Sequence, residues 1–350
     1  MCYNSLVNGR SNFFDLQDNQ DMAPLADRHN RIATNLRVSV TDVCNLRCLY
    51  CMTEKMDFVE RSEIMTFDEI VRLVGISVSL GVNKVRLTGG EPLVRKNLPE
   101  LVENLFAIRG LTDVSLTTNG IGLASQAQKF YDVGLRRINI SLDSLSEVKF
   151  AQITRRNLLG QVLDGLEEAR QVGFDPIKIN AVPMRGFTED EVLDLVEFAR
   201  NNGYEMRFIE FMPLDADNIW GQEMFIPNTE LKDRIGQAFP LQGEEDGRRL
   251  HATAKDYWFR DGKGKIGFIS SVTEPFCHDC NRVRLTADGK FRNCLFALEE
   301  TDLLTPLRHG ATDLHLADLM RQSVADKAEG HLINSQNYIK PKRNMSMIGG

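Results

Sequence analysis

The sequence predicts an α/β fold built on a parallel sheet. From residue 36 onward, short runs rich in β-branched residues alternate with amphipathic stretches. Repeated strand–helix units of this kind form parallel sheets with right-handed crossovers. Polar and glycine-rich residues follow the predicted strands directly, at 89–91 and 117–119 for example. Open doubly wound sheets and partial (β/α) barrels both place their active sites at that edge, so both architectures remain open at this point.

The individual elements follow from periodicity and from turn residues. Strands are expected at residues 36–41, 84–89, 113–118, 137–142, 177–182 and 206–211. Helices are expected between them, at residues 67–81, 98–108, 124–134, 159–173 and 189–203. Several of these helices end on a glycine, the residue preferred where a helix terminates in the left-handed conformation.

The alternation stops after residue 226. A helix at 229–238, hairpin-like strands near 256–271, a hairpin around 287–289 and a helix near 313–326 are expected next. The tail from residue 334 to residue 350 shows no periodicity and ends in Ile-Gly-Gly. We therefore expect a flexible extension over residues 1–32, a sheet domain over 33–226, and a smaller α+β region over 227–350 packed on that domain.

Composition narrows the class of function. The chain has 350 residues, 42% of them apolar and 26% charged, with a net charge of −7. Such a balance gives no general basic field for nucleic acid. No apolar run approaches the roughly 18 residues of a membrane span, and the N-terminal stretch resembles neither a signal nor a transit peptide. We expect a cytoplasmic protein that contacts neither nucleic acid nor membrane.

Three cysteines on one predicted loop give the first chemical signal. The run TDVCNLRCLYCM places Cys44, Cys48 and Cys51 directly after the first strand, with Tyr50 before the third cysteine. Three thiolates satisfy three irons of a [4Fe–4S] cube and leave the fourth iron open to a substrate or cofactor. Zinc with a distant fourth ligand and a loop without metal are the alternatives.

A glycine-rich loop, TGGEP at residues 88–92, ends the second predicted strand. Its glycines let backbone amides approach a ligand closely, and Glu91 offers a carboxylate to an ammonium group. A purely structural turn is equally consistent with this run.

Together these two motifs resemble the radical S-adenosylmethionine (SAM) superfamily. The resemblance rests on Cys44, Cys48, Tyr50 and Cys51, with Gly89, Gly90 and Glu91 at the end of the second strand. It implies a partial (β/α)6 TIM-like barrel and a [4Fe–4S] cluster whose open iron chelates the amino and carboxylate groups of SAM. It also implies that electron transfer cleaves SAM to a 5′-deoxyadenosyl radical.

A second set of three cysteines lies in the C-terminal region. Cys277, Cys280 and Cys294 are consistent with a zinc ribbon or with another iron–sulfur cluster. His278 lies between the first two and is a strained candidate for a fourth ligand. Nearby, Arg282 and Arg284 alternate on a predicted strand and so point to one side, as suits a phosphate-bearing substrate or a solvated strand face.

Further basic residues lie on the predicted strands of the first domain. Arg37, Arg86 and Lys178 would converge in a barrel lumen, and buried cations need partners. Several cations in one lumen suit a triphosphate, which side chains would hold because the sequence has no P-loop.

From residue 33 to the C-terminus the chain resembles the GTP 3′,8-cyclases, which catalyse the first step of molybdenum cofactor biosynthesis. The shared motifs are CxxxCxYC, RLTGGEPLVR, TTNG, ISLDSL, IKIN, FIEFMPL, the CxxC–RVRLTxDGK–C element and the terminal Gly-Gly. The resemblance implies SAM contacts at Tyr50, Gly90, Glu91, Ser141 and Met212. It implies GTP contacts at Arg37, Arg86, Thr117, Lys178, Arg282, Val283 and Arg284.

The resemblance also assigns roles to the C-terminal region. Cys277, Cys280 and Cys294 would hold a second [4Fe–4S] cluster whose open iron meets the guanine. The tail residues Gly349 and Gly350 would reach the active site, where the family also places Arg37, Arg282 and Arg284. Cys2 lies outside the match, and we assign it no role.

The implied reaction is the conversion of GTP to (8S)-3′,8-cyclo-7,8-dihydroguanosine 5′-triphosphate by a lyase. The adenosyl radical removes hydrogen from the ribose C3′, and C3′ then bonds to C8 of the guanine. The expected partners are an electron donor of the flavodoxin or ferredoxin type, a downstream pyranopterin-forming synthase and a second copy of the chain in a homodimer. The alternatives are a peptide- or RNA-modifying radical SAM enzyme with an auxiliary cluster, and a zinc-stabilised nucleotide-binding module without catalysis.

Overall fold

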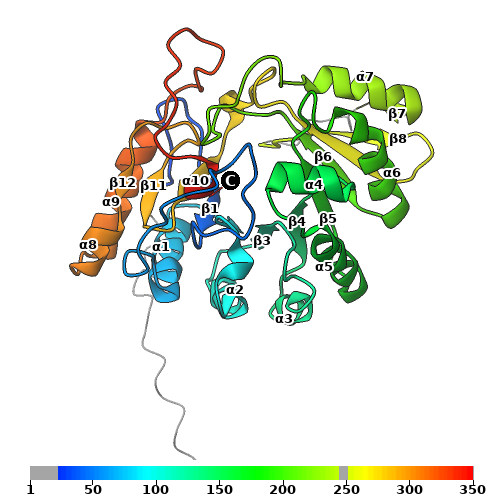
Figure 1. Cartoon of the computed structure of the whole chain (residues 1–350). Helices are drawn as coiled ribbons and strands as arrows, with labels where there is room; N and C mark the ends of the chain where they lie inside the picture. The colour runs from blue at the N-terminus through cyan, green and yellow to red at the C-terminus, as the bar shows by residue number, and fades with distance from the viewer. Residues whose placement is uncertain (1–22, 244–250, 350) are drawn as a thin grey trace, which may run out of the picture.

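The computed structural model describes residues 23–243 and 251–349, which form a partial barrel around one twelve-stranded sheet. Six parallel strands make its centre: β1 (Asn35–Ser39), β2 (Lys84–Thr88), β3 (Asp113–Thr118), β4 (Arg137–Ser141), β5 (Ile177–Ala181) and β6 (Glu205–Ile209). All six coincide with the predicted strands to within two residues at each end. Their helices lie on the outside of the curved sheet, while the C-terminus reaches its centre (Figure 1).

The helices between these strands follow the predicted order. They are α1 (Phe67–Ser79), α2 (Leu98–Phe106), α3 (Ala127–Asp132), α4 (Glu147–Thr154), α5 (Leu159–Val172) and α6 (Val192–Asn202). Thr66 and Glu69 form a reciprocal capping box at the start of α1, which fixes where that helix begins. The sequence did not predict α4, whose apolar pattern is weak and whose buried residues include Phe150 and Ile153.

The C-terminal region continues the sheet at both of its ends. β9 (Lys265–Ile269) pairs in parallel with β6, and β10 (Arg282–Leu285) pairs in parallel with β1. Antiparallel strands complete the edges: β7 (Leu241–Gln242), β8 (Lys255–Phe259), β11 (Lys290–Arg292) and β12 (Thr301–Asp302). Both predicted hairpins are therefore present, and they widen the barrel sheet instead of forming a separate layer.

The remaining helices cover these added strands or end the chain. They are α7 (Asn228–Ala238), α8 (Leu304–Arg308), α9 (Asp313–Ala325) and α10 (Met345–Ile348). Both α7 and α9 match predicted helices. The single turn of α10 is too short to give a periodic signal, and Figure 1 shows it in the middle of the sheet beside β1.

Residues 23–32 are packed against the barrel, although they fall within the extension that was expected to be flexible. Leu25 is fully buried and its N–H donates to the carbonyl of Leu80. Arg31 is also buried and pairs with Asp27 at 2.5 Å. The ordered domain therefore begins earlier than residue 33. Residues 1–22, including Cys2, lie outside the described part of the chain.

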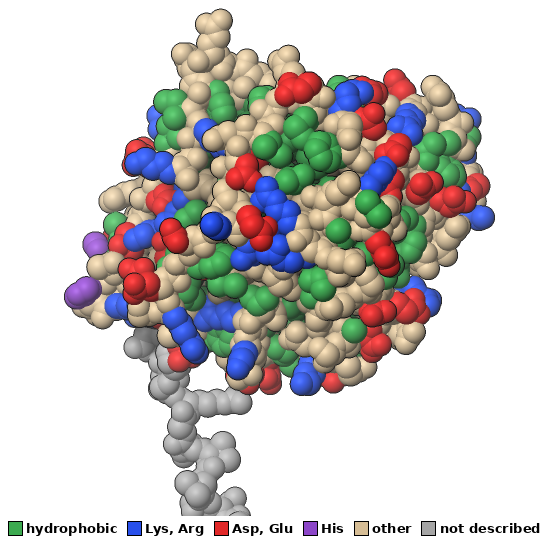
Figure 2. Space-filling view, in the orientation of Figure 1, with side chains coloured by type: hydrophobic (Ala, Val, Ile, Leu, Met, Phe, Trp, Pro, Cys, Tyr) green, Lys and Arg blue, Asp and Glu red, His purple; other side chains and the backbone are tan. Residues whose placement is uncertain are grey.

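Strand alternation divides the buried residues into two sets. Leu36 and Val38 on β1 are fully buried and belong to the hydrophobic core, whereas Arg37 between them lines the cavity inside the barrel. No described helix is both long and apolar enough to cross a membrane. On the face seen in Figure 2, Lys and Arg side chains are interspersed with Asp and Glu side chains.

Candidate active site

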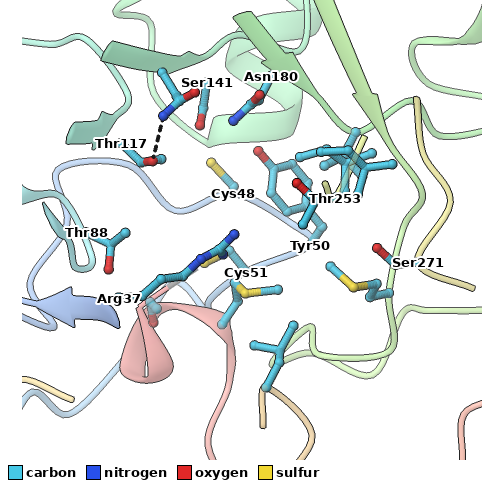
Figure 3. Close-up of a pocket in the computed structure, with 18 of the residues that line it drawn as sticks. Arg37, Cys48, Tyr50, Cys51, Thr88, Thr117, Ser141, Asn180, Thr253 and Ser271 are labelled. Carbon is cyan, nitrogen blue, oxygen red and sulfur yellow. Dashed lines mark hydrogen bonds between the residues drawn. The ribbon is translucent and has the colours of Figure 1, made fainter. Parts of the chain in front are cut away.

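One cavity at the carboxyl ends of the barrel strands gathers most of the predicted site. It is lined by all six cysteines of the two triads, by Tyr50, Gly90, Glu91, Ser141 and Met212 of the SAM set, and by Arg37, Arg86, Thr117, Arg282 and Arg284 of the GTP set. Figure 3 shows Cys48, Cys51 and Tyr50 in the same space as Arg37 and Ser141. Two distant segments of sequence, residues 44–51 and 277–294, thus meet across one lumen.

The first triad lies on the loop after β1. None of the six cysteines in the described residues forms a disulfide, and Cys51 N–H donates to the carbonyl of Cys48 at 2.9 Å in a tight turn. Leu46 N–H points at Cys44 Sγ from 3.4 Å. Burial raises the pKa of Cys44 to about 11 and that of Cys51 to about 12. Without a bound cation these three sulfurs are therefore thiols.

Two carboxylates lie beside the first triad, and both are engaged by protein donors. Tyr50 Oη donates to Asp143 Oδ2 at 2.6 Å, and Val182 N–H donates to the other oxygen at 2.8 Å. These bonds fix the Tyr50 ring at the wall of the cavity (Figure 3). Burial raises the pKa of Asp143 to about 6. Asp143 was not among the predicted site residues, although it lies in the ISLDSL motif just after β4.

Glu91 braces the ends of β2 and β3. Its Oε1 accepts from Leu93 N–H at 2.9 Å and from Thr118 Oγ1 at 2.6 Å, while Oε2 accepts from Asn119 N–H at 2.6 Å. Burial raises the pKa of this carboxyl to about 7. The carboxylate predicted to meet an ammonium group thus already receives three protein donors and shapes the loop edge.

Gly90 is required by close backbone packing. A Cβ at this position would lie 2.3 Å from the carbonyl oxygen of Asp42 and 2.5 Å from that of Val43. Both carbonyls belong to the segment that leads into the first triad. Glycine therefore lets the cysteine loop rest directly on the end of β2, which is a structural reason for the TGGEP motif.

The second triad is held by β10 and β11. Cys280 lies two residues before the start of β10, and Cys294 lies two residues after the end of β11. Arg282 Nη2 lies 3.3 Å from Cys280 Sγ, and Phe296 N–H lies 3.4 Å from Cys294 Sγ. Burial alone would raise the pKa of Cys280, but the charges of Arg282 and Lys327 lower it to about 6. This sulfur is a thiolate at neutral pH.

A different histidine from the one considered in the sequence lies at the second triad. His278 is exposed and is not among the cavity-lining residues. His331 lines the cavity, packs against Phe296 with ring centroids 5.1 Å apart, and has a ring nitrogen 2.9 Å from the carbonyl of Ser271. His331 lies outside any motif, so no sequence signal marked it.

Three arginines form a row across adjacent strands. Arg37 on β1 is the register partner of both Arg284 on β10 and Arg86 on β2. Burial, with repulsion from Arg282, lowers the pKa of Arg284 to about 9. Burial, with repulsion from Arg284 and Arg86, lowers the pKa of Arg37 well below its ordinary value. Burial, with repulsion from Arg207, lowers the pKa of Arg86 to about 10. Several guanidinium groups held close together in this way are typical of a site that binds an anion.

Within the described residues, the arginine row of Arg284, Arg37 and Arg86 forms hydrogen bonds to neutral groups. Arg284 donates to the carbonyl of Gly349, and Arg86 Nε donates to Ser115 Oγ at 3.3 Å. Two further polar groups that line the cavity, Arg207 Nε and Asn180 Oδ1, are buried without a hydrogen-bond partner. The sequence analysis did not name Arg207, although it alternates along β6 as Arg37 does along β1.

Lys178 and Val283, both predicted to contact GTP, do not line the cavity. Lys178 lies on β5 two residues before Asn180, and its Nζ pairs with Glu205 at 2.8 Å. Burial lowers the pKa of Lys178 to about 8. Val283 lies between Arg282 and Arg284 in the sequence of β10, so its side chain points to the opposite face of that strand from theirs. The side chain of Val283 is fully buried there.

The C-terminal tail closes one side of the cavity. Gly349 has a φ of +81°, and a Cβ there would lie 2.6 Å from Thr88 Oγ1. Upstream, Arg343 pairs with Asp288 at 2.7 Å, which ties the tail to the turn between β10 and β11. Ser346, in α10, lines the cavity beside the first triad. Gly350 lies outside the described residues.

Comparison with known proteins agrees with this architecture. The family model of the Radical SAM superfamily matches residues 38–199, and that of Molybdenum Cofactor Synthesis C matches residues 204–333. Among solved structures, Streptococcus suis SuiB bound to S-adenosylmethionine aligns with a TM-score of 0.59 at 13% identity, covering 90% of this chain and 78% of that one. A likeness at this identity supports the partial-barrel fold.

Curated relatives give the more specific result. The GTP 3′,8-cyclase of Streptomyces coelicolor (strain ATCC BAA-471 / A3(2) / M145) is 44% identical over 328 residues, which cover 93% of this chain and 96% of the relative. The mitochondrial GTP 3′,8-cyclase of Arabidopsis thaliana is 41% identical and covers 96% of this chain and 86% of the relative. With this similarity along nearly its whole length, the chain belongs to the GTP 3′,8-cyclase family and is a radical SAM enzyme of molybdenum cofactor biosynthesis.

Proposed function

We propose that the cavity binds SAM at the first triad and GTP between the arginine row and the second triad. The observation that carries this proposal is the row of Arg284, Arg37 and Arg86, whose guanidiniums face one lumen and bond only neutral groups in the described residues. Buried cations without counter-ions are costly, and a triphosphate would satisfy several of them at once. Arg207, with its orphaned Nε, extends the same site.

The first triad is suited to a [4Fe–4S] cluster. In the described residues, no group of three His, Cys, Asp or Glu side chains is arranged to hold a single metal ion. Three thiolates that each bind a different iron of a cube need not converge on one point, so the arrangement favours a cluster over zinc. With SAM bound, this cluster would supply the 5′-deoxyadenosyl radical that removes hydrogen from the ribose C3′.

The chain's own residues would position SAM beside this cluster. Tyr50, fixed by Asp143, would pack against the cofactor, and Ser141 and Met212 line the same wall. Gly90 would offer backbone groups, because its lack of a side chain keeps the edge of β2 open to the loop of the first triad.

The second triad would hold a second [4Fe–4S] cluster facing the guanine. Its three sulfurs line the same cavity, and Cys280 is already a thiolate because Arg282 and Lys327 lie beside it. Iron binding needs thiolates, so this site is electrostatically prepared for metal. Guanine at this end and phosphates on the arginines would leave the ribose between the two triads.

Positioning would then account for most of the protein's contribution to rate. The arginine row would fix the phosphates, the second triad would fix the base, and the tail with Gly349 would limit access of water to the lumen. A closed lumen also protects a radical from side reactions. An electron donor of the flavodoxin or ferredoxin type, a downstream pyranopterin-forming synthase, a homodimer and a cytoplasmic location stay predictions.

The test is anaerobic turnover with reconstituted protein. Incubation with SAM, a reductant and GTP should yield 5′-deoxyadenosine together with the cyclised nucleotide, whereas ATP should yield only background. Measured iron should be about eight per chain if both triads hold cubes. Zinc in place of iron, or no 5′-deoxyadenosine above background with GTP, would overturn the proposal.

A further inference from the structure

Lys327 lies against the second triad but does not line the cavity. The residue is 4% exposed, and its Nζ lies 3.5 Å from Cys280 Sγ. The same amine donates to the carbonyl of Cys280 at 3.1 Å and to that of Arg282 at 2.9 Å. Within the described residues, none of these partners is a carboxylate. Among the hydrogen-bond partners of Lys327 Nζ in the described residues, the sulfur of Cys280 is therefore the one that can carry a negative charge.

The fold holds this amine in place from two directions. Lys327 follows the end of α9, and its N–H donates to the carbonyl of Val324 at 3.0 Å in the last turn. Two residues on, the carbonyl of Glu329 accepts from Arg31 Nη1 at 2.6 Å, and the same nitrogen bonds the carbonyl of Cys277 at 2.7 Å. The segment that carries Lys327 is therefore fixed to the loop of the second triad.

Burial of a lysine in such a place is expensive. It removes a strongly hydrated charge from water and orders a flexible side chain, whose rotamer freedom is worth up to about 2 kcal/mol. Two backbone carbonyls could be satisfied by a neutral donor at lower cost. We therefore expect the positive charge of Lys327 to have a function, and the group that this charge contacts is the sulfur of Cys280.

We infer that Lys327 is a positioning residue that donates a hydrogen bond to the ligand sulfur of Cys280 and raises the reduction potential of the second cluster. This inference rests on the second cluster proposed above. Reduction adds one electron, and hence one negative charge, to an iron–sulfur cube. A buried cation hydrogen-bonded to a ligand sulfur favours that reduced state, because cluster potentials depend on nearby charge and on hydrogen bonds to sulfur.

The first triad provides the contrast. Hydrogen bonds to its sulfurs in the described residues come from neutral groups, including Leu46 N–H at 3.4 Å and the Asn119 amide at 3.8 Å from Cys44. Glu91 and Asp143 add negative charge on that side of the cavity. The two clusters should therefore differ in potential, with the second more easily reduced, and Lys327 should supply part of the difference.

The experiment isolates the second cluster in the full chain. A variant with Cys44→Ser, Cys48→Ser and Cys51→Ser retains only the second triad, and its iron is reconstituted anaerobically. Lys327→Gln, which keeps a neutral donor, and Lys327→Arg, which keeps the charge, are then made in this background. Each protein is titrated with dithionite and mediators, and the reduced cluster is followed by its paramagnetic signal. Lys129→Gln on the exposed face of α3 is the matched control.

At the midpoint potential of the parent, Lys327→Gln should lower the ratio of reduced to oxidised cluster about tenfold, which corresponds to 59 mV for a one-electron couple. Lys327→Arg and Lys129→Gln should keep the parent ratio to within about twofold, the factor that 18 mV would give on the same scale. Equal midpoints in Lys327→Gln and Lys327→Arg would overturn the inference, because charge would then have no effect.

Iron content gives a second, independent criterion. Loss of iron in Lys327→Gln with retention in Lys327→Arg supports the inference, since the positive charge beside Cys280 Sγ would then be needed to hold the cluster. Loss of iron in both would overturn it, because the side chain would then act through packing alone. Absence of iron from the parent that retains Lys327 would instead refute the second cluster itself, and so separates the two failures.

Discussion

The two cysteine triads have the same ligand count but opposite electrostatic surroundings. Burial raises the pKa values of Cys44 and Cys51 to about 11 and 12, and Glu91 adds to the effect at Cys44. At the second triad, Arg282 and Lys327 lower the pKa of Cys280 to about 6 despite its burial. The two triads therefore offer similar sets of sulfur ligands, and the surrounding charges are what distinguishes them.

The difference follows from which strands surround each triad. The first lies on a loop packed against β2 and β3, whose ends carry Glu91 and Asn119. The second lies beside β10 and β11, where Arg282 on β10 and Lys327, two residues after α9, lie against Cys280. An acidic neighbourhood suits a cluster that must deliver an electron, since it disfavours added negative charge. A basic one suits a site for an anionic nucleotide.

Removing one ligand of the second triad should produce the largest effect. We expect Cys294→Ala to abolish cyclisation and to reduce iron from about eight to about four per chain, while the first cluster still forms. Iron analysis and product formation after anaerobic reconstitution measure both outcomes. Cys2→Ala is the matched control and should behave as the parent. Retained turnover in Cys294→Ala would remove the second cluster from the mechanism.

The arginine row should determine nucleotide affinity. Arg284→Ala should weaken GTP binding by about 1.5–3 kcal/mol, roughly 10- to 150-fold, because a hydrogen bond between charged groups is lost. Equilibrium binding of GTP without reductant measures this change. Arg109→Ala, at an exposed position after α2, should leave the affinity unchanged. An unaltered affinity in Arg284→Ala would place the phosphates or the base elsewhere.

The contrast in thiol ionisation can be tested in iron-free protein. At pH 7.5 Cys280, with a pKa of about 6, is ionised, whereas Cys44 and Cys51, with values of about 11 and 12, are protonated. Because the thiolate is the reactive form, iodoacetamide should label Cys280 about tenfold faster than either.

Peptide mapping by mass spectrometry gives these labelling rates. The rate at Cys280 should fall as pH drops through 6, since protonation removes the thiolate, and the other two should rise steadily with pH above neutrality. Equal labelling of the two triads would break the comparison between them.

A substitution at Gly349, the last described residue of the tail, should have the smallest effect. Gly349→Ala combines a positive φ of +81° with a Cβ that would lie 2.6 Å from Thr88 Oγ1. Gly122→Ala has the same backbone strain at a φ of +82°, but its nearest atom is 3.8 Å away. Both should lose about 1–2 kcal/mol of unfolding free energy.

Only Gly349→Ala should also lower the ratio of cyclised product to 5′-deoxyadenosine, because it disturbs the partner of Arg284. Quantifying both products in one reaction measures this coupling. A similar ratio in both variants would mean that the tail has no part in positioning GTP.

Much of the barrel could be predicted because its signals are local. The strands from β1 to β6 read as short apolar runs, and their helices read as amphipathic repeats with glycine at their ends. Helix α4 was missed because its pattern is weak, and α10 because one turn carries no periodicity. The addition of β9 and β10 to opposite ends of one sheet could not be foreseen, since pairing with β6 and β1 joins residues far apart in the sequence.

The site residues also divide into those that the sequence predicted and those that it did not. Motif spacing marked the six cysteines, Tyr50 and the strand arginines, and the structure brings these residues to one cavity. It left out Arg207, which enters the cavity through strand alternation, and His331, which lies outside any motif. It also gave no role to Asp143, although that residue lies in the ISLDSL motif. It also included Lys178, whose amine instead pairs with Glu205.

The sequence by itself determined the chemistry that is available: two incomplete sets of thiolates, a glycine-rich strand end, and arginines at alternate positions. These properties depend on residue type and on short spacings, which survive without a fold. The tertiary structure alone decided that both triads face one lumen, that three arginines share a register row, and that Lys327 reaches the sulfur of Cys280. Charged groups interact through space rather than along the chain, so these interactions depend on how distant segments pack together.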